Sequence, residues 1–380
     1  VVVTGFGAIT PIGNNAQEYW ENLVKGVSGA APITLFDSTN FKTKFACEVK
    51  NFNPLDHFEK KEAKKMDRNT QLGVVAAREA VSHSRIIEDQ VDKNRVGVIW
   101  GSGIGGLETF ETEVLGWAKS EGIPRFNPFF IPKMIADITP GHVSMEYGFH
   151  GPNYTTVSAC ASSTNALIDA KMLLQLGKAD VIVCGGSEAA VTASGMGGFN
   201  SMMALSTRND DYKTASRPFD KDRDGFVLGE GAGCIILEEY EHAKKRGATI
   251  YAELAGGGLS ADAYHMTAPH PEGLGAYLVM KNCLEDAGVT PDEVDHINMH
   301  GTSTPLGDIA ESNAIVKLLG EHAFDIQINS TKSMTGHLLG AAGVIEAIAA
   351  LGTILHGIVP PTINHFTDDE NIDSRLDFTF

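Results

Sequence analysis

Two hydrophobic patterns alternate along the chain. Short runs of β-branched and other apolar residues, typical of buried strands, are separated by longer stretches whose apolar positions recur at helical spacing. The predicted strands are Val1–Thr4, Val96–Trp100, Val181–Cys184, Cys234–Leu237, Ile250–Leu254, His296–Met299 and Ile326–Asn329. The predicted helices are Glu18–Lys25, Thr70–His83, Ser163–Leu176, Leu274–Ala287, Asp308–Leu319 and Gly343–Leu355. This alternation indicates an α/β fold whose sheets are covered by helices.

The order of these segments repeats weakly within the chain. In the first part, one strand ends in Gly101-Ser102-Gly103, and a segment of small residues opens the helix at Ser163–Leu176. In the second part, a strand ends before His300-Gly301-Thr302, and Asn329–Gly336 precedes another long helix. The repeat predicts that the chain is built from two similar units.

We place these units at residues 1–245 and 246–380. No low-complexity linker separates them, so we expect the two halves to pack as one rigid body. The segment Ser201–Leu228 is rich in Asp, Arg and Ser, and we expect it to be a surface excursion of the first half.

Composition and charge exclude several classes of protein. Hydrophobic residues make up 43% of the 380 positions, which is enough for a large core and argues against disorder. The formal charge of −18 argues against nonspecific binding to nucleic acid or to an anionic membrane. We find no run of about 18 apolar residues and predict no transmembrane helix. Five scattered cysteines without a C-x-x-C pair indicate a reducing cytoplasm and argue against structural zinc.

Three motifs are weaker than their patterns suggest. The run Gly101–Gly106 satisfies G-x-G-x-x-G after a strand, but no second strand with an acidic end follows at the spacing of a dinucleotide site. The acidic run Asp220–Gly225 resembles the start of a calcium loop, but position twelve is Gly231 instead of Glu. His265 and His270 lack the spacing of a helical metal pair. We therefore predict a tight glycine turn and no metal site.

Cys160 is the strongest candidate nucleophile. It follows a strand-like run and precedes a helix, among small neighbours that leave room for a ligand. At a helix N-terminus, free backbone N–H groups and the macrodipole favour a thiolate. The alternative is a buried, inert cysteine, an interpretation that suits Cys184 and Cys234 within their strands.

Two histidines strengthen the case for catalysis. His300 follows a strand at its carboxyl end, where α/β folds place their ligands, and His337 lies in the segment that parallels the Cys160 segment. A thiolate with two imidazoles can transfer acyl groups, and imidazole N–H groups can stabilise an enolate oxygen. Lys332 and Glu346 lie nearby in an apolar stretch and need partners if buried. Each of these residues could instead be a satisfied polar core residue.

Three segments carry a resemblance to a known family. They are Ser158-Ala159-Cys160, Met299-His300-Gly301-Thr302-Ser303-Thr304 and Thr331-Lys332-Ser333-Met334-Thr335-Gly336-His337, with further matches at 205–210, 217–220, 224–231 and 360–364. Together they closely resemble the β-ketoacyl-[acyl-carrier-protein] synthases of the thiolase superfamily, almost from end to end. The Cys-His-His set resembles the elongating, synthase II-like class, whereas initiating synthases use Cys-His-Asn. The resemblance implies a thiolase-like duplicated α/β/α/β/α layered fold.

The resemblance also implies a reaction, fatty acid elongation. Cys160 would accept an acyl chain as a thioester, and His300 and His337 would promote decarboxylation of a malonyl group and stabilise the enolate. Lys332 and Glu346 would support the histidines electrostatically. No cofactor is expected, because the phosphopantetheine arm belongs to the acyl-carrier protein, which is the expected partner.

Further roles follow from the same resemblance. The expected substrate-binding residues are Thr302 and Thr304 for the pantetheine arm, Ile104 for the acyl pocket and Phe199 near the entrance. The expected carrier-docking residues are Lys64, Lys65, Arg68, Arg125 and Arg208. The segment 59–68 is locally basic on an acidic chain, although an ordinary solvated helix face has the same composition. We expect a cytoplasmic homodimer that binds neither nucleic acid nor membrane.

Family members extend beyond the position matching Phe380, through about thirty residues whose glycine-rich loop supplies a gating Phe and an oxyanion-hole donor, so we expect a longer natural chain. A polyketide ketosynthase would use the same chemistry on another chain. A non-catalytic subunit that resembles chain-length factors is a further alternative, although those lack the nucleophile matched by Cys160. A degradative thiolase would need a second catalytic cysteine near the C-terminus.

Overall fold

A six-stranded mixed sheet contains five strands of the first half and one short strand, β8, from the start of the second, in the order β5-β4-β6-β7-β1-β8. The computed structural model describes residues 1–380. Strand β4 is parallel to β5 and β6, whereas β7 is antiparallel to β6 and β1, and β8 is antiparallel to β1. The strands of this sheet are β1 (Val2–Ile9), β4 (Val96–Gly101), β5 (Asn153–Thr156), β6 (Val181–Glu188), β7 (Gly231–Glu238) and β8 (Ala252–Glu253). A separate short ribbon pairs β2 (Ala31–Pro32) with β3 (Phe45–Ala46).

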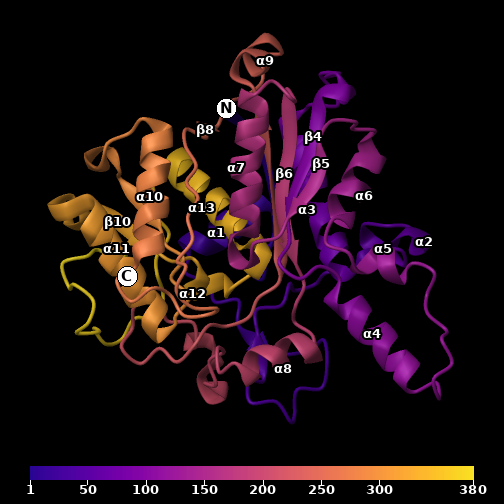
Figure 1. Cartoon of the computed structure of the whole chain (residues 1–380), viewed down its shortest axis with the longest axis horizontal. Coiled ribbons are helices and arrows are strands. Elements are labelled where there is room, and N and C mark those ends of the chain that lie inside the picture. The colour runs from indigo at the N-terminus through magenta and orange to yellow at the C-terminus, as the bar shows by residue number, and fades with distance from the viewer.

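Helices cover both faces of this sheet (Figure 1). Along β6, Val181 and Val183 point into one apolar cluster with α3, while Ile182 and Cys184 point into another with α7 and α13. This alternation is the period-two pattern of a strand buried on both faces. The α-helices are α1 (Ala16–Val24), α2 (Lys60–Ala63), α3 (Arg68–Ser84), α4 (Leu107–Ala118), α5 (Phe130–Met134), α6 (Ile138–Tyr147), α7 (Ser162–Gln175), α8 (Ala193–Ser201), α9 (Tyr240–Lys245), α10 (Leu274–Ala287), α11 (Pro305–Leu319), α12 (Lys332–Thr335) and α13 (Ala342–His356).

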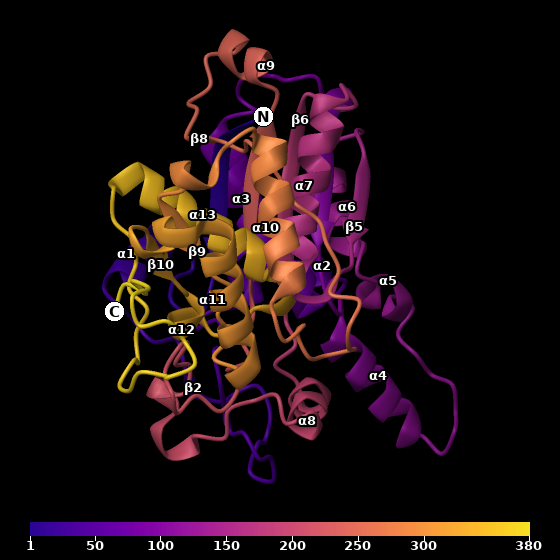
Figure 2. The same ribbon diagram turned by 60° about the vertical axis from the view of Figure 1, so that its left-hand side comes forward.

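The second half has a smaller sheet. Strands β9 (His296–Asn298) and β10 (Gln327–Asn329) pair in parallel, and α10 and α11 lie side by side next to them (Figure 2). Helix α13 of this half packs on β7 and α7 of the first half. The two parts therefore share a continuous interior, and the α/β layered architecture agrees with the predicted thiolase-like fold.

Most elements predicted from the hydrophobic pattern are present. All seven predicted strands and six predicted helices occur, with shifted ends, although the strand predicted at Ile250–Leu254 is reduced to Ala252–Glu253. The edge strand β5 and the helices α4 to α6 were not predicted, because their apolar positions are irregular; those of α4 are largely exposed, whereas α6 buries Pro140 and Val143.

The expectation for Ser201–Leu228 was wrong in one respect. Its second part is buried, and Phe219 and Val227 are each 1% exposed. The carbonyl of Val227 accepts a hydrogen bond from the N–H of His337, and Asp220 accepts bonds from two backbone N–H groups of the C-terminal segment. Its polar residues are therefore satisfied within the protein, which composition alone did not reveal.

One segment, Leu339–His356, is apolar enough to cross a membrane by length and composition, with a mean hydropathy of 1.6 over 18 residues. It comprises a short 3-10 turn and α13, and 56% of it is buried inside the protein against β7 and α7. Its hydrophobicity is thus explained by its position in the core, where a helix apolar on most sides is expected.

Candidate active site

Cys160 lies where the edge strand gives way to a helix. It is the middle residue of the 3-10 turn Ala159–Ala161, directly before α7, and its side chain is half-buried. Ala159 has a left-handed φ of 51°, which turns the chain sharply. The Ser162 hydroxyl accepts a hydrogen bond from the Ser158 N–H and donates one to the Ala159 carbonyl, which closes the turn. The thiol therefore lies at a helix N-terminus, as the sequence predicts.

His337 contacts the thiol directly. Its Nε2 lies 3.0 Å from the Sγ of Cys160. The N–H of Leu339 donates to Nδ1 at 3.2 Å, so the proton of the neutral ring resides on Nε2. The main chain is held on both sides, by the Val227 carbonyl and the Gly229 N–H. His337 is thus oriented as a hydrogen-bond donor toward the sulfur.

His300 joins the cluster from the second half. The backbone N–H groups of His300 and Gly301 donate to the two oxygens of Glu311 on α11, at 2.7 and 2.9 Å. The His300 and His337 rings meet edge to face, with centroids 5.1 Å apart. The reactive atoms of Cys160, His300 and His337 all lie within 4.8 Å of one another. Glu311 was missed by the sequence reasoning, because nothing in the pattern separates it from other acidic residues on a helix.

A buried ion pair adjoins the imidazoles. Lys332 is 2% exposed, and its Nζ pairs with the carboxylate of Glu346 on α13. Burial, His300 and the Lys332 charge hold the pKa of His337 well below its usual 6.5. His300 retains exposed surface, but the protein atoms around its ring, together with Lys332, lower its pKa to about 3. Both imidazoles are therefore neutral at pH 7.

The protonation state of Cys160 differs from the sequence expectation. Burial raises the pKa of its thiol above the usual 9.0, and the opposing effect of Lys332 is smaller. The helix N-terminus alone therefore does not keep a thiolate at neutral pH. The sulfur accepts a hydrogen bond from Nε2–H of His337, and such a bond strengthens as negative charge develops on sulfur. The site stabilises the thiolate when it forms during reaction.

The glycine motif encloses a carboxylate of the protein itself. Glu188, at the end of β6, is 0% exposed and accepts hydrogen bonds from the N–H groups of Gly103 and Ile104, at 2.8 and 3.1 Å. It also accepts one from the Gly340 N–H at 3.0 Å. These donors, which would bind a phosphate in a nucleotide site, are already occupied, which agrees with the prediction of a tight turn. Glu188 was not singled out from the sequence.

The residues expected to bind substrate lie on loops next to the cluster, except for Phe199, which lies on α8. The hydroxyls of Thr302 and Thr304 are 2.9 Å apart, just after His300. Phe199 packs edge-on against Phe226, whose ring in turn meets His337 edge-on. Ile104 is 41% exposed on the glycine turn. These positions are compatible with the expected roles, which stay predictions.

The residues expected to dock a carrier differ in availability. Lys64 and Arg125 are exposed and form no ion pair, whereas Lys65 pairs with Glu62 at 2.8 Å. The Arg208 guanidinium donates to the Asp222 carbonyl.

Arg68 has another task. Its guanidinium forms a bidentate ion pair with the fully buried carboxylate of Glu230, with contacts of 2.6 and 2.8 Å. Its side chain is only 15% exposed. The structure thus favours removing Arg68 from the docking set, because its charge is needed to neutralise a buried carboxylate.

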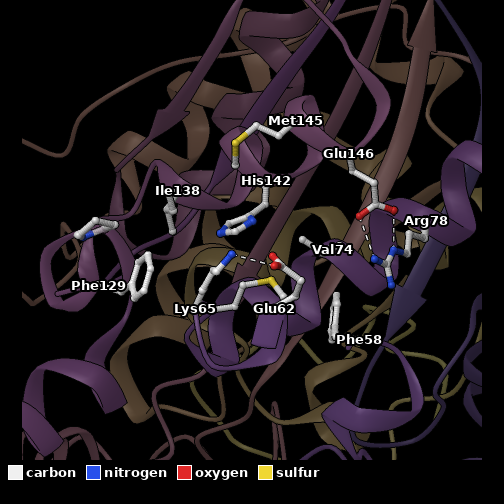
Figure 3. A pocket seen from close by; sticks show the side chains of 12 residues that line it. Phe58, Glu62, Lys65, Val74, Arg78, Phe129, Ile138, His142, Met145 and Glu146 are labelled. Atoms are coloured by element: carbon white, nitrogen blue, oxygen red, sulfur yellow. Dashed lines mark hydrogen bonds and ion pairs between the residues drawn. The ribbon is translucent and has the colours of Figure 1, made fainter. Parts of the chain in front are cut away.

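A cavity of about 560 Å³ lies between α2, α3, α5 and α6 (Figure 3). Apolar side chains such as Phe58 and Met145 line it, with His142 at its centre. Its charged groups pair with one another, Glu62 with Lys65 and Arg78 with Glu146. None of the catalytic candidates lines this cavity.

The Cys-His-His cluster is compact enough for a metal ion, since thiolate and imidazole are common ligands. However, a nitrogen that binds a metal must be unprotonated. The Leu339 N–H occupies Nδ1 of His337, so the nitrogen that faces Cys160 carries the proton. The geometry therefore favours hydrogen bonding and proton transfer at this cluster.

A half-buried thiol faced by two neutral imidazoles, at the junction of two α/β halves, defines a thiol-dependent acyltransferase site. Comparison with protein families agrees with that class. Residues 1–243 match the beta-ketoacyl synthase N-terminal domain, and residues 251–366 match the beta-ketoacyl synthase C-terminal domain. The chain belongs to the beta-ketoacyl synthase family.

Similar proteins narrow the activity. The chain is 48% identical over 373 residues to the 3-oxoacyl-[acyl-carrier-protein] synthase 2 of Synechocystis, covering 98% of this chain and 89% of that protein. It is 49% identical to the protein of the same name from Staphylococcus aureus strain COL, covering 98% and 90%.

Solved structures show the same fold. A complex of a type II polyketide ketosynthase with its acyl-carrier protein superposes with a TM-score of 0.91 at 34% identity, covering 100% of this chain and 91% of that one. The ishigamide ketosynthase/chain length factor gives a TM-score of 0.90 at 37% identity, with the same coverage.

Replacing His337 with Asn should flatten the pH dependence of stability. The pKa of His337 is lowered in the folded protein, so below its usual 6.5 the unfolded chain binds a proton that the native state does not. Stability is therefore lost as pH falls from 6.5, at up to about 1.4 kcal/mol per pH unit from this one group. Urea unfolding between pH 6.5 and about 4.5 measures the slope.

The control for this experiment is His265→Asn, which removes an exposed imidazole outside the site. It should keep the parental slope. A His337→Asn slope equal to that of the parent would contradict a depressed pKa.

Proposed function

We propose that this chain catalyses the decarboxylating condensation of an acyl group with malonyl-acyl-carrier protein, yielding 3-oxoacyl-acyl-carrier protein and CO₂ in fatty acid elongation. The observation that carries this proposal is the contact of the Cys160 sulfur with the protonated nitrogen of His337, beside His300. The similarity to proteins named 3-oxoacyl-[acyl-carrier-protein] synthase 2 supports the same reaction.

The first step is acyl transfer to Cys160. Its sulfur attacks the thioester carbonyl of the acyl carrier, the carbon–sulfur bond to the pantetheine thiol breaks, and that thiol leaves with the proton of the Cys160 thiol. The Nε2–H of His337 stabilises negative charge on the sulfur as it forms. Thr302 and Thr304 present hydroxyls that can bind the pantetheine arm.

The second step forms the new carbon–carbon bond. Loss of CO₂ from the malonyl thioester leaves an enolate, whose oxygen needs neutral donors nearby. The neutral rings of His300 and His337 supply such donors, and the low pKa of each ensures that neither holds a positive charge that must be discharged later. The enolate carbon then attacks the carbonyl carbon of the acyl-Cys160 thioester, the carbon–sulfur bond breaks, and the Cys160 sulfur leaves as a thiolate that takes up a proton from solvent.

Lys332 lowers the pKa values of both histidines and forms no hydrogen bond with the Cys160 sulfur. Its ion pair with Glu346 neutralises a charge that would otherwise be costly to bury. Its remaining positive field disfavours protonation of the two imidazoles. This supports the expected role of Lys332 and Glu346 as groups that tune the histidines.

The polyketide alternative receives less support. The type II polyketide ketosynthase is 34% identical to this chain and the ishigamide ketosynthase/chain length factor 37%, below the 48–49% shared with the 3-oxoacyl-[acyl-carrier-protein] synthases. A non-catalytic subunit would have no need for the thiol and the two histidines in contact. We place the protein in the cytoplasm, in keeping with its five unpaired cysteines.

Replacing Cys160 with Ala should abolish acyl loading, because no other thiol lies at the cluster. After incubation with an acyl-carrier protein that bears a hexanoyl group, mass spectrometry should find the hexanoyl mass on Cys160 of the parent and no such mass on the Cys160→Ala variant. The matched control is Cys283→Ala, which removes the only other cysteine with partial exposure. Loading that persists in Cys160→Ala would refute the role of Cys160 as the nucleophile.

In His300→Ala and His337→Ala, release of CO₂ from the malonyl carrier should stop.

Carrier binding should depend on the two exposed cations without partners. Changing both Lys64 and Arg125 to Glu should raise the KM for the malonyl carrier by about fivefold or more at low salt and leave kcat unchanged, since about 1 kcal/mol is typical of an exposed charge contact. Added salt should weaken binding by the parent. Lys245→Glu, on the exposed face of α9, is the control. An unchanged KM in the double variant would argue against docking at these residues.

We propose in addition that the chain forms a homodimer through the β5 edge. Strand β5 pairs only with β4, so its outer backbone groups are free for a second copy. Large apolar side chains are exposed on the flanking segments, among them Ile131 at 55% and Val157 at 64%. An unpaired strand edge beside exposed apolar surface is typical of an interface.

Ile131→Glu should convert the dimer to a monomer, because it introduces a charge into that apolar surface. Sedimentation velocity at micromolar concentration should give the parent twice the mass of one chain. The control is Ile354→Glu, an equally apolar and 67% exposed position on α13. A parent that sediments as a monomer would contradict the proposal.

A further inference from the structure

The carboxylate of Glu188 joins two turns that come from different halves of the chain. Its Oε2 accepts from Gly103 of the first half and from Gly340 of the second, while Oε1 accepts from Ile104. The side chain is completely buried and no cation pairs with it. A buried carboxylate held mainly by backbone N–H groups, with longer bonds of 3.4 Å from the Ser102 hydroxyl and the Gly105 N–H, requires these donors to stay in place.

The turn at Gly340 also carries the catalytic contact. Leu339 has a left-handed φ of 47°, which is unfavourable for a residue with a branched side chain, and its N–H donates to Nδ1 of His337. The next N–H in the chain, that of Gly340, donates to Glu188. Two consecutive N–H groups are thus aimed at His337 and at Glu188.

The close approach of the turns allows no side chain at Gly340. A Cβ there would collide with the backbone nitrogen of Gly103 and lie 2.7 Å from Oε2 of Glu188. Gly340 occupies the middle of the 3-10 turn Leu339–Ala341, the position that Cys160 occupies in the turn Ala159–Ala161. The second half therefore uses this position to bind Glu188, where the first half presents the thiol.

From this geometry, we propose that Glu188 is a positioning residue for the condensation reaction. Its carboxylate holds the turn Leu339–Gly340 in place, so that Nδ1 of His337 stays a hydrogen-bond acceptor and Nε2–H points at Cys160. The same carboxylate also binds the turn that bears Ile104, so the position of this turn relative to His337 is fixed. Its kinetic consequence rests on the proposed function, whereas its effect on His337 does not.

The experiment compares Glu188→Gln with Glu79→Gln. In Glu188→Gln an NH₂ group replaces one oxygen among N–H donors, which breaks bonds while conserving shape. Glu79 is a matched control, since its carboxylate also accepts two backbone N–H bonds of 2.9 Å, from Ala8 and Ala16, away from the cluster. Both changes should lower the thermal midpoint. Only Glu188→Gln should lower kcat, by about 10- to 100-fold, with the KM for malonyl carrier within about twofold.

A spectroscopic measurement reports on His337 without turnover. With ¹⁵N-labelled histidine, and His337→Asn to assign the signals, the parent should show His337 with a proton on Nε2 and a hydrogen-bonded, unprotonated Nδ1. This Nδ1 signal should change in Glu188→Gln and stay in Glu79→Gln. A proton on Nδ1 in the parent, or identical His337 signals in parent and Glu188→Gln, would overturn the proposal.

Gly340→Ala supplies a second variant if Glu188→Gln does not fold, because it displaces the same N–H and should reproduce both effects. Amide exchange of the parent gives a third arm: the Gly103, Ile104 and Gly340 amides should be protected together, and rapid exchange of any one would count against a shared carboxylate. An inactive parent with the expected His337 signals would refute the proposed function alone. An active parent with an equally active Glu188→Gln would refute the positioning role alone.

Discussion

The site depends on the close approach of two helix N-termini from opposite halves of the chain. Helices α7 and α13 begin side by side, and the N–H of Val344 donates to the hydroxyl of Ser163. The two helices can approach this closely only where side chains are absent, because an added Cβ at Gly343 would collide with Thr164 of α7. An added Cβ at Gly340 would likewise collide with the backbone of Gly103 in the glycine turn. This contact brings the thiol of one half against the imidazole of the other.

Electrostatic effects then determine the protonation states of the Cys160 thiol and the two imidazoles. Burial acts on both groups in the direction of neutrality: it raises the pKa of the Cys160 thiol and lowers those of the histidines. The Lys332–Glu346 pair adds a positive field that further disfavours charged imidazoles. A neutral donor next to a latent thiolate suits a reaction whose negative charge moves between sulfur and an enolate oxygen, because each intermediate meets the same preorganised N–H groups.

Several residues serve the site from positions that their sequence context does not reveal. The glycine motif, which has the pattern of a nucleotide-binding turn, donates its backbone N–H groups to the carboxylate of Glu188. Glu311 holds the backbone of His300 and Gly301. Arg68, which stands in a basic segment, neutralises the buried Glu230. The partners of Glu188 and Arg68 are more than 80 positions away along the chain, and those of Glu311 precede its helix by several residues. A local pattern therefore shows the charge but not the group that satisfies it.

The sequence by itself determined the α/β class, most strands and helices, and the three chemical groups of the candidate site. Strand β6 was predictable because it is a short run of apolar, mostly β-branched residues, as a strand buried on both faces requires. Cys160 was predictable because small residues surround it before a helix. Only the tertiary structure decided the protonation states, since burial and Lys332 act through space. Folding likewise decided that the second part of the segment Ser201–Leu228 is interior and which acidic residues anchor the catalytic turns. Hydrophobic periodicity is a local property of the chain, whereas desolvation and pairing depend on contacts that form when the chain folds, many of them between residues more than 100 positions apart, such as Cys160 and His337.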